Sequence, residues 1–400
     1  MAPASPASMS AAPPAHRTIV LLSLAAFASA ASIRVTDALL VRISGDYGVS
    51  LASASNVVTV FAILYGLMQL AMGPLGDRHG KLRVIAAACA AAAVASLACA
   101  AAPTFETLVL ARAAAGAACA CVIPLSMAWI GDVTPYESRQ GVLARFLLGQ
   151  ITGLSAGVAL GGFAADGATW QWPFAVLAAW FVAIGLLIGR VGWRQPAGAQ
   201  APGGNAVANL LEVLRTPGVA RILTVVFLEG LVLLGPLAFV ATHLHLVRGA
   251  PMSLAGTMFF AVSAGGFLFA FFARRIVPVL GEARLAILGT VIVSASVAGI
   301  AWAPTIAAAP VSCFGAGMGF YMLHNTLQTN ATQMAPTRRG TAVALFAGIF
   351  FLGQSGGVAV AGQLAQAIGT AWTLTASALA VLPVGIGFAL SRRPAAIRGP

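Results

Sequence analysis

The stretch GPLGDRHGKLR, residues 73–83, places four charged side chains and a histidine between two long apolar runs. In the whole chain 60% of the residues are hydrophobic and 8% are charged, whereas about a quarter are charged in soluble globular domains. The mean hydropathy of +0.93 points the same way. The sequence therefore predicts a membrane protein in which residues 73–83 form a short polar loop between two membrane-spanning helices.

A helix needs about 20 apolar residues to cross a hydrocarbon core of roughly 30 Å. No basic segment precedes the first apolar run, which argues against a cleavable signal peptide. Residues 1–16, rich in proline, alanine and serine, are expected to be a disordered tail. We expect an all-α membrane protein with twelve spans, at residues 18–41, 52–75, 84–102, 106–130, 142–164, 171–190, 219–242, 254–273, 285–304, 308–332, 341–363 and 370–390.

One longer polar segment, RVGWRQPAGAQAPGGNAVANLLEVLRTPG (190–218), divides the spans into two sets of six. The tripeptide SLA recurs at Ser50–Ala52 and Ser253–Ala255, at the start of the second span of each half. Parallel halves are typical of transporters that bind substrate between them at mid-membrane. We expect an N-terminal bundle, a cytoplasmic linker, a C-terminal bundle and a cytoplasmic tail at residues 17–190, 191–218, 219–391 and 392–400.

The distribution of basic residues indicates how the chain crosses the membrane. If the N-terminus is cytoplasmic, all 22 Lys and Arg residues except Arg34, Arg42, Arg112 and Arg248 lie in the even-numbered loops, in the two tails or at the span ends next to them. This asymmetry is the positive-inside rule, so we expect both termini in the cytoplasm. The net charge of +12 then reflects topology in a lipid bilayer, and we expect no nucleic-acid partner.

The loop at residues 73–83 resembles the signature loop of the major facilitator superfamily, G-x-L-a-D-R-x-G-r, through Gly73, Leu75, Asp77, Arg78, Gly80 and Lys81. The resemblance implies the major facilitator fold, with two pseudo-symmetric six-helix bundles. It also implies that Asp77 lies against the start of span eleven and latches the halves together when the cavity opens outward. The alternative is that the charges of this loop serve only to keep it on the cytoplasmic side of the membrane.

Two further stretches resemble the same family. LVLARAAAG (108–116) is similar to the span-four pattern, with Ala115 in place of its glutamine. GLSAGVALGG is similar to the glycine-rich motif of drug/proton antiporters, although Val158 replaces its proline; the matching residues are Gly153, Gly157, Gly161 and Gly162. The resemblance implies a twelve-span exporter, whereas glycines four residues apart also form ordinary helix-packing surfaces in membranes.

Ionisable side chains within spans cost about 2.5–3.5 kcal/mol each at a helix centre, so each needs a partner or a role. By the family resemblance, spans one, four, seven and ten line the central cavity. Span one carries Arg34 and Asp37, and span four carries Arg112. At about 1.5 Å per residue these three lie at similar depths. We expect a polar cluster in which Asp37 is shared between the two arginines, or a structural ion pair near the interface.

In the C-terminal half, Glu229 on span seven and His324 on span ten are expected to meet near the midplane. Because no arginine is identified at its depth, Glu229 is the predicted proton-coupling site, with His324 as a relay and Asp37 as a further candidate. The alternative is a protonated Glu229 bonded to Asn325 or Gln328 as helix glue.

Amides and arginines within the spans are candidate polar contacts for a substrate, and they can equally serve as packing glue. His243 and His245, near the outer mouth of span seven, are expected to be solvated. The candidate substrate contacts are Arg34, Arg112, Asn325, Gln328, Gln69 and Gln150.

Motifs of other functional classes do not occur in the sequence. It has no G-x-x-x-x-G-K-[ST], H-E-x-x-H or G-x-S-x-G pattern, so we expect no ATPase, no enzyme, no catalytic residues and no cofactor. The cysteines all fall within predicted spans and indicate neither a disulfide framework nor a metal site; they are Cys89, Cys99, Cys119, Cys121 and Cys313.

The sequence therefore predicts a secondary transporter of the inner membrane, a monomer that moves a small organic or amphipathic compound by alternating access. Proton-coupled efflux is the favoured direction. An uptake symporter or facilitator for a sugar, amino acid or organic acid shares the fold, and fold alone does not decide between them. A transport-inactive sensor or assembly partner is the alternative from another class.

Overall fold

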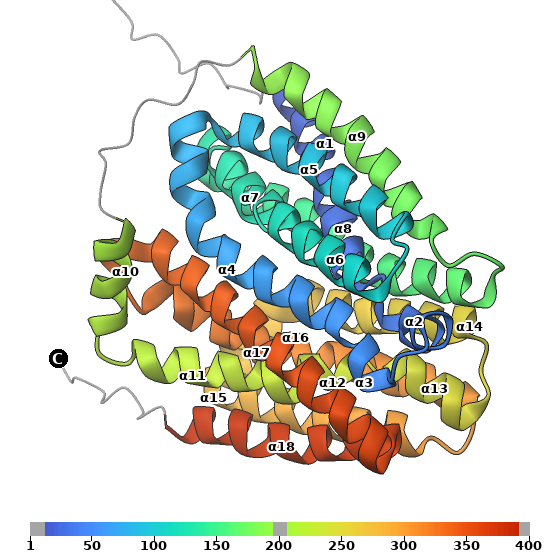
Figure 1. Cartoon of the computed structure of the whole chain (residues 1–400). Coiled ribbons are helices and arrows are strands. Elements are labelled where there is room, and N and C mark those ends of the chain that lie inside the picture. The colour runs from blue at the N-terminus through green and yellow to red at the C-terminus, as the bar shows by residue number, and fades with distance from the viewer. Residues whose placement is uncertain (1–12, 195–205, 392–400) are drawn as a thin grey trace, which may run out of the picture.

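The computed structural model describes residues 13–194 and 206–391, so most of the expected N-terminal tail, part of the linker and the C-terminal tail lie outside the described residues. The first half of the described chain consists of helices joined by short turns (Figure 1). They are α1 (Pro13–Arg34), η1 (Asp37–Leu39), α2 (Leu40–Tyr47), α3 (Leu51–Ala54), α4 (Asn56–His79), α5 (Lys81–Ala100), α6 (Phe105–Cys119), α7 (Val122–Val133), α8 (Tyr136–Asp166) and α9 (Trp172–Gly192).

The second half begins with a short amphipathic helix and continues through a similar series of long helices. They are α10 (Ala206–Arg215), α11 (Val219–Glu229), the π-helix η2 (Gly230–Leu234), α12 (Gly235–Leu237), α13 (Val240–Arg248), α14 (Met252–Thr257), α15 (Phe259–Trp302), η3 (Ile306–Ala308), α16 (Ala309–Gln333), η4 (Pro336–Arg338), α17 (Arg339–Ile368) and α18 (Thr370–Leu390).

The helices confirm the twelve-span architecture. Eleven segments of the described chain are long and apolar enough to cross a membrane, and one of them, Met252–Trp302, has 51 residues. At 1.5 Å per residue that segment would be about 75 Å long, more than twice the hydrocarbon thickness. It contains two spans, because α15 turns back at Gly281, whose φ of +70° suits a residue without a side chain.

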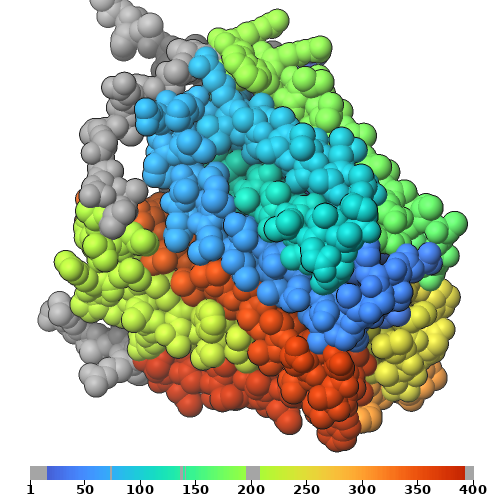
Figure 2. All heavy atoms as spheres, in the orientation of Figure 1, coloured from blue at the N-terminus to red at the C-terminus, as the bar shows by residue number. Residues whose placement is uncertain are grey.

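Two hydrophobic cores meet along the middle of the molecule. Most buried apolar residues of α1–α9 form one cluster and most of those of α11–α18 form the other. A few residues belong to the core of the opposite half: Val158 packs with the second core and Phe239 with the first. Figure 2 shows the resulting seam, with the N-terminal half above and the C-terminal half below.

The bundle has two distinct ends. We call the end at which α1 begins and α18 ends the termini end, which lies toward the upper left in Figure 1. The opposite end, with the turns that follow α2 and α13, is the far end. Helices α4 and α17 run side by side across the seam, where the glycines at 66 and 348 bring the two backbones together.

The first and seventh spans are both interrupted near the far end. Helix α1 stops at Arg34 and the chain resumes as η1 at Asp37, while α12 stops at Leu237 and α13 begins at Val240. Asp37 and Val240 are separated by the same number of residues as Ser50 and Ser253, the repeated positions found in the sequence. The internal repeat therefore extends to the breaks in the helices.

The glycines of span five form a packing surface, in agreement with their four-residue spacing. A Cβ at Gly153 would collide with the backbone of Phe27, and one at Gly157 with that of Ala31. Gly161 lies against Val35 in the same way, whereas the neighbouring Gly162 faces Met252 of the other half. Helix α8 can approach α1 this closely only because these positions lack side chains.

The signature loop is shorter than expected. Helix α4 continues through Asp77 to His79, and the turn into α5 is made by Gly80 alone, which has a φ of +89°. The charged residues of the loop therefore sit on the last turn of one helix and the first turn of the next.

Gly157→Leu is expected to lower the free energy of unfolding by roughly 1–3 kcal/mol, because the added side chain cannot be accommodated between α8 and α1. Gly141→Leu is the matched control on the same helix, since a Cβ there meets nothing within 4 Å. Thermal unfolding of both variants in detergent measures the difference. Equal melting temperatures would show that the close approach is not required.

Candidate functional site

The break in the first span holds a buried ion pair. Arg34 ends α1 and Asp37 begins η1, and Arg34 Nε lies 3.0 Å from Asp37 Oδ2. Asp37 is fully buried and Arg34 is 6% exposed. The guanidinium of Arg34 also lies over the ring of Phe259, 5.4 Å from its centroid, so the pair reaches the seam with the C-terminal half.

Arg112 of α6 lies at the same level but has different partners. It donates hydrogen bonds to the backbone oxygens of Ser32 (3.0 Å) and Val57 (3.2 Å) and to the hydroxyl of Thr36 (3.4 Å). Asp37 forms its ion pair with Arg34, while Arg112 lies close enough to Asp37 to interact with its charge and directs its hydrogen bonds elsewhere. Arg112 instead ties the interrupted first span to the second, through carbonyls and a hydroxyl.

The second cluster joins spans seven and ten. Nδ1 of His324 lies 2.9 Å from Oε2 of Glu229, which brings together the two residues that depth estimates placed near the midplane. Glu229 is fully buried, and its Oε1 has no hydrogen-bond partner among the described residues. The partner of Glu229 is thus His324 rather than Asn325 or Gln328, the partners of the helix-glue alternative.

Aromatic rings surround His324. The imidazole lies 4.7 Å from the ring of Phe350, 5.1 Å from that of Phe320 and 5.6 Å from that of Phe346. Phe320 precedes His324 by one helical turn, and Phe346 and Phe350 are one turn apart on α17. This i, i+4 spacing is visible in the sequence, but nothing in it shows that α17 would face His324.

A π-helix follows Glu229 directly. Residues Gly230–Leu234 form η2, and the hydroxyl of Ser377 on α18 donates to the carbonyl of Val232. A Cβ at Gly230 would collide with the backbone of α17 around Phe350. Such π-helical turns are rare and frequently occur at functional sites. This one sets the position of Glu229 relative to α17.

The other candidate contacts do not join either cluster directly. Gln69 is buried, Gln150 and Asn325 are half-buried, and Gln328 is exposed.

The expectation for His243 is wrong, because this residue is fully buried and its Nδ1 lies 2.9 Å from Oγ1 of Thr370. His243 therefore links span seven to α18 near the far end. His245 is half-buried, with Nδ1 2.8 Å from the carbonyl of Ala250.

Leu75, Asp77 and Arg78 of the signature loop are exposed at the termini end. Nζ of Lys81 lies 3.3 Å from Oδ1 of Asp77 and 2.7 Å from Oδ2 of Asp132, so the three form a network within the N-terminal half. The side chain of Asp77 is 47% exposed. In this conformation its partner is Lys81, and the contact with span eleven stays a prediction for the outward-open state.

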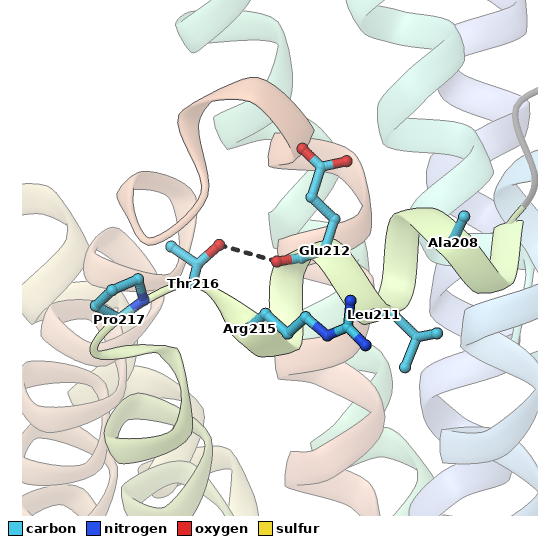
Figure 3. Close-up of a pocket in the computed structure, with 6 residues that line it drawn as sticks. All are labelled: Ala208, Leu211, Glu212, Arg215, Thr216 and Pro217. Carbon is cyan, nitrogen blue, oxygen red and sulfur yellow. Dashed lines mark hydrogen bonds between the residues drawn. The ribbon is translucent and has the colours of Figure 1, made fainter.

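A surface pocket lies on α10, away from both clusters (Figure 3). It is lined by one continuous segment that includes Leu211, Arg215 and Pro217, and the hydroxyl of Thr216 donates to the carbonyl of Glu212. The carboxylate of Glu212 also forms an exposed ion pair with Arg338, 2.9 Å away. The pocket contains no convergent set of buried polar groups and is not the candidate site.

A family model and the similar known proteins agree on one family. A model described as Major Facilitator Superfamily matches residues 22–358. The uncharacterized MFS-type transporter YceJ of Bacillus subtilis is 26% identical over 335 residues, 82% of this chain and 84% of YceJ. The multidrug export protein EmrB of Haemophilus influenzae is 29% identical over 173 residues, 43% of this chain. That match spans 33% of EmrB, about a third of the relative's length.

Solved structures share the fold at low sequence identity. A bacterial homolog of the human lysosomal transporter Spinster, in an inward-facing and unoccupied conformation, superimposes with a TM-score of 0.70 and 19% identity over 95% of each chain. The nucleoside transporter NupG has a TM-score of 0.77 and 15% identity, over 93% of this chain and 98% of that one.

Arg112→Gln is expected to destabilise the N-terminal half strongly, since hydrogen bonds to a charged group contribute about 1.5–3 kcal/mol each and carbonyls inside the membrane would lose their donors. Arg338→Gln is the control, because it removes an exposed arginine whose ion pair is 43% and 50% exposed. Thermal unfolding in detergent compares the two. A melting temperature for Arg112→Gln as high as that of the control would contradict the role of Arg112 as a tie between spans.

Proposed function

Because this chain belongs to the Major Facilitator Superfamily, we propose that it is a proton-coupled exporter that moves small amphipathic compounds out of the cell. The family makes it a transporter of small molecules. The coupling of transport to protons and the outward direction of transport are what we propose beyond the family. Named multidrug exporters among the relatives support the direction, although each match is partial and of low identity.

The observation that carries the proposal is the pair Glu229–His324. A buried carboxylate is costly when charged, and Oε1 of Glu229 has no hydrogen-bond partner among the described residues. His324 can hold or release a proton 2.9 Å away. Uptake or release of one proton changes the net charge of this pair by one unit, which is the property that a coupling site needs.

The two clusters would have different roles. In the N-terminal half, Asp37 has Arg34 as a permanent counter-ion, and Arg112 is committed to the backbone. In the C-terminal half, Glu229 has only an imidazole, whose charge depends on a proton. We therefore assign proton binding to Glu229 and His324, and we keep Asp37 as the second candidate.

Alternating access would follow from the two halves. We propose bundle boundaries at residues 17–190 and 219–391, cytoplasmic termini, an inner-membrane location and a monomeric state. In this topology the far end is periplasmic. The seam packs tightly there, as between Gly162 and Met252 and between Gly256 and Val158, so we assign this conformation as one that is closed to the periplasm.

In that conformation, substrate would enter from the cytoplasm and compete with the proton on Glu229. Closing the termini end would bring Asp77 against the start of α17 and leave substrate facing outward. Aromatic rings around His324 suit an apolar or amphipathic compound. Uptake of a sugar, amino acid or organic acid, by symport or by facilitated diffusion, uses the same two access states and is the alternative.

Glu229→Gln is expected to abolish proton coupling, because the amide cannot take up and release a proton. Everted membrane vesicles with an acidified lumen and a pH-sensitive dye measure proton release when drugs, sugars or amino acids are added. The wild type and Glu106→Gln, an exposed glutamate at the far end, should release protons on addition of a substrate. Glu229→Gln should show only background release.

If coupled release survives in Glu229→Gln, the coupling site lies elsewhere and Asp37→Asn is the next variant to measure. If no compound releases protons from the wild type, efflux by antiport is excluded for that panel, and accumulation in whole cells tests uptake.

Asp77→Asn is expected to slow transport sharply while the protein stays folded, because Asp77 would stabilise only the outward-open state. Asp132→Asn is the comparison, since it removes the other carboxylate bound to Lys81. Transport rates and melting temperatures of the two variants are measured together. Full activity of Asp77→Asn would contradict the latch.

A further inference from the structure

The far end is closed where α8 meets α14. Helix α8 belongs to the N-terminal half and α14 to the C-terminal half, and their backbones approach so closely that a Cβ at Gly162 would collide with Met252. Further along the same seam, the hydroxyl of Ser155 bonds to the carbonyl of Phe259, and that of Ser263 to the carbonyl of Ile151 at 3.0 Å. Small residues and hydroxyl groups take part in this contact, together with the buried apolar side chains of Val158 and Met252.

One charged group takes part in it. Asp166, the last residue of α8, accepts hydrogen bonds from two backbone amides of the other half. The amide of Met252 donates to Oδ1 at 3.0 Å, and the amide of Ser253 donates to Oδ2 at 2.8 Å. Each carboxylate oxygen is thus bound across the seam.

We propose that Asp166 is a latch that holds the far end closed and thereby sets the ratio between the two access states. This rests on the alternating-access cycle proposed above. The amides of Met252 and Ser253 begin α14, so they have no carbonyl acceptor within their own helix. When α8 and α14 separate, both amides and the carboxylate must exchange these bonds for water.

The carboxylate makes this contact stronger than the rest of the seam. Hydrogen bonds to an ionised acceptor are shorter and about twice as strong as neutral ones. The serine hydroxyls provide neutral bonds that either half can replace with its own carbonyls, as Thr257 does with Leu254. Asp166 therefore stabilises the closed far end relative to the open one. A neutral residue at position 166 would stabilise it less.

The chain offers a matched control at the same end. Asp46 is also an exposed aspartate there, but its partner is Arg42, 3.0 Å away in the same half. Substitution of Asp46 removes a carboxylate from the far end without removing a bond between the halves. A conformational effect of Asp166 alone would therefore identify the bonds across the seam as its cause.

The test measures distances between spin labels in purified protein without substrate or proton gradient. One pair, at Thr169 and Leu246, reports on the far end, and a second pair, at Val133 and Thr337, reports on the termini end; all four positions are exposed. The native cysteines of the described chain are buried, and labelling of protein without added cysteines gives their background.

In Asp166→Asn and Asp166→Ala we expect the far-end distance to lengthen and the termini-end distance to shorten, with about a tenfold or larger change in the ratio of the two populations. Asp46→Asn should match the wild type. Ser253→Pro removes one donor from the other half at a position in the first helical turn, which tolerates proline. It should shift the populations in the same direction as Asp166→Asn.

Wild-type distance distributions in folded Asp166→Ala, or an equal shift in Asp46→Asn, would overturn the latch. These distances require no transported compound. A failed search for substrates therefore bears on the proposed export and leaves the latch standing, whereas unchanged distances refute the latch and leave the proton-coupling assignment untouched.

Discussion

The constraint on which the rest of this structure depends is that backbone groups inside a bilayer must find partners within the protein. Unbroken helices satisfy it automatically, but the first and seventh spans are interrupted where they line the seam. Arg112 supplies donors to Ser32 and Val57 around the first interruption, and Ser377 supplies one to Val232 in the π-helix before the second. Buried polar residues therefore make the irregular spans possible, and those spans place the site residues.

The two halves satisfy this constraint with different side chains, and we base the different roles proposed for the two clusters on this difference. The N-terminal half uses permanent charges, with the Arg34 guanidinium beside the Asp37 carboxylate and Arg112 donating to carbonyls. The C-terminal half uses hydroxyl groups for the backbone and leaves Glu229 with a single titratable neighbour. We propose for this reason that the C-terminal cluster, whose carboxylate faces an imidazole and not a permanent cation, is the one that exchanges a proton during transport.

Hydropathy and charge distribution were sufficient to predict the twelve spans, and helical rise was sufficient to place Glu229 opposite His324. These features depend on the length and hydrophobicity of each segment and on the position of a residue along it, which can be read from a single sequence. The break at Arg34, the π-helix at Gly230 and the burial of His243 could not be predicted, because each depends on a partner from another span. The hydrogen-bond partners of Arg112 could not be predicted for the same reason. Its depth in the membrane follows from the sequence, but its bonds to the carbonyls of Ser32 and Val57 depend on how the interrupted first span packs against the second.

Small residues allow the halves to pack closely and still separate. Within the N-terminal half, Gly153 and Gly157 join α8 to α1 along several turns, and this contact has no reason to open during transport. Across the seam, Gly162 and Gly256 allow similar proximity, but only over the far part of α8. Close glycine contact excludes water at these two positions without large side chains. The polar bonds across the seam add a directional contribution to this contact, and the carboxylate of Asp166 makes two of them, which is why we propose it as the latch of the far end.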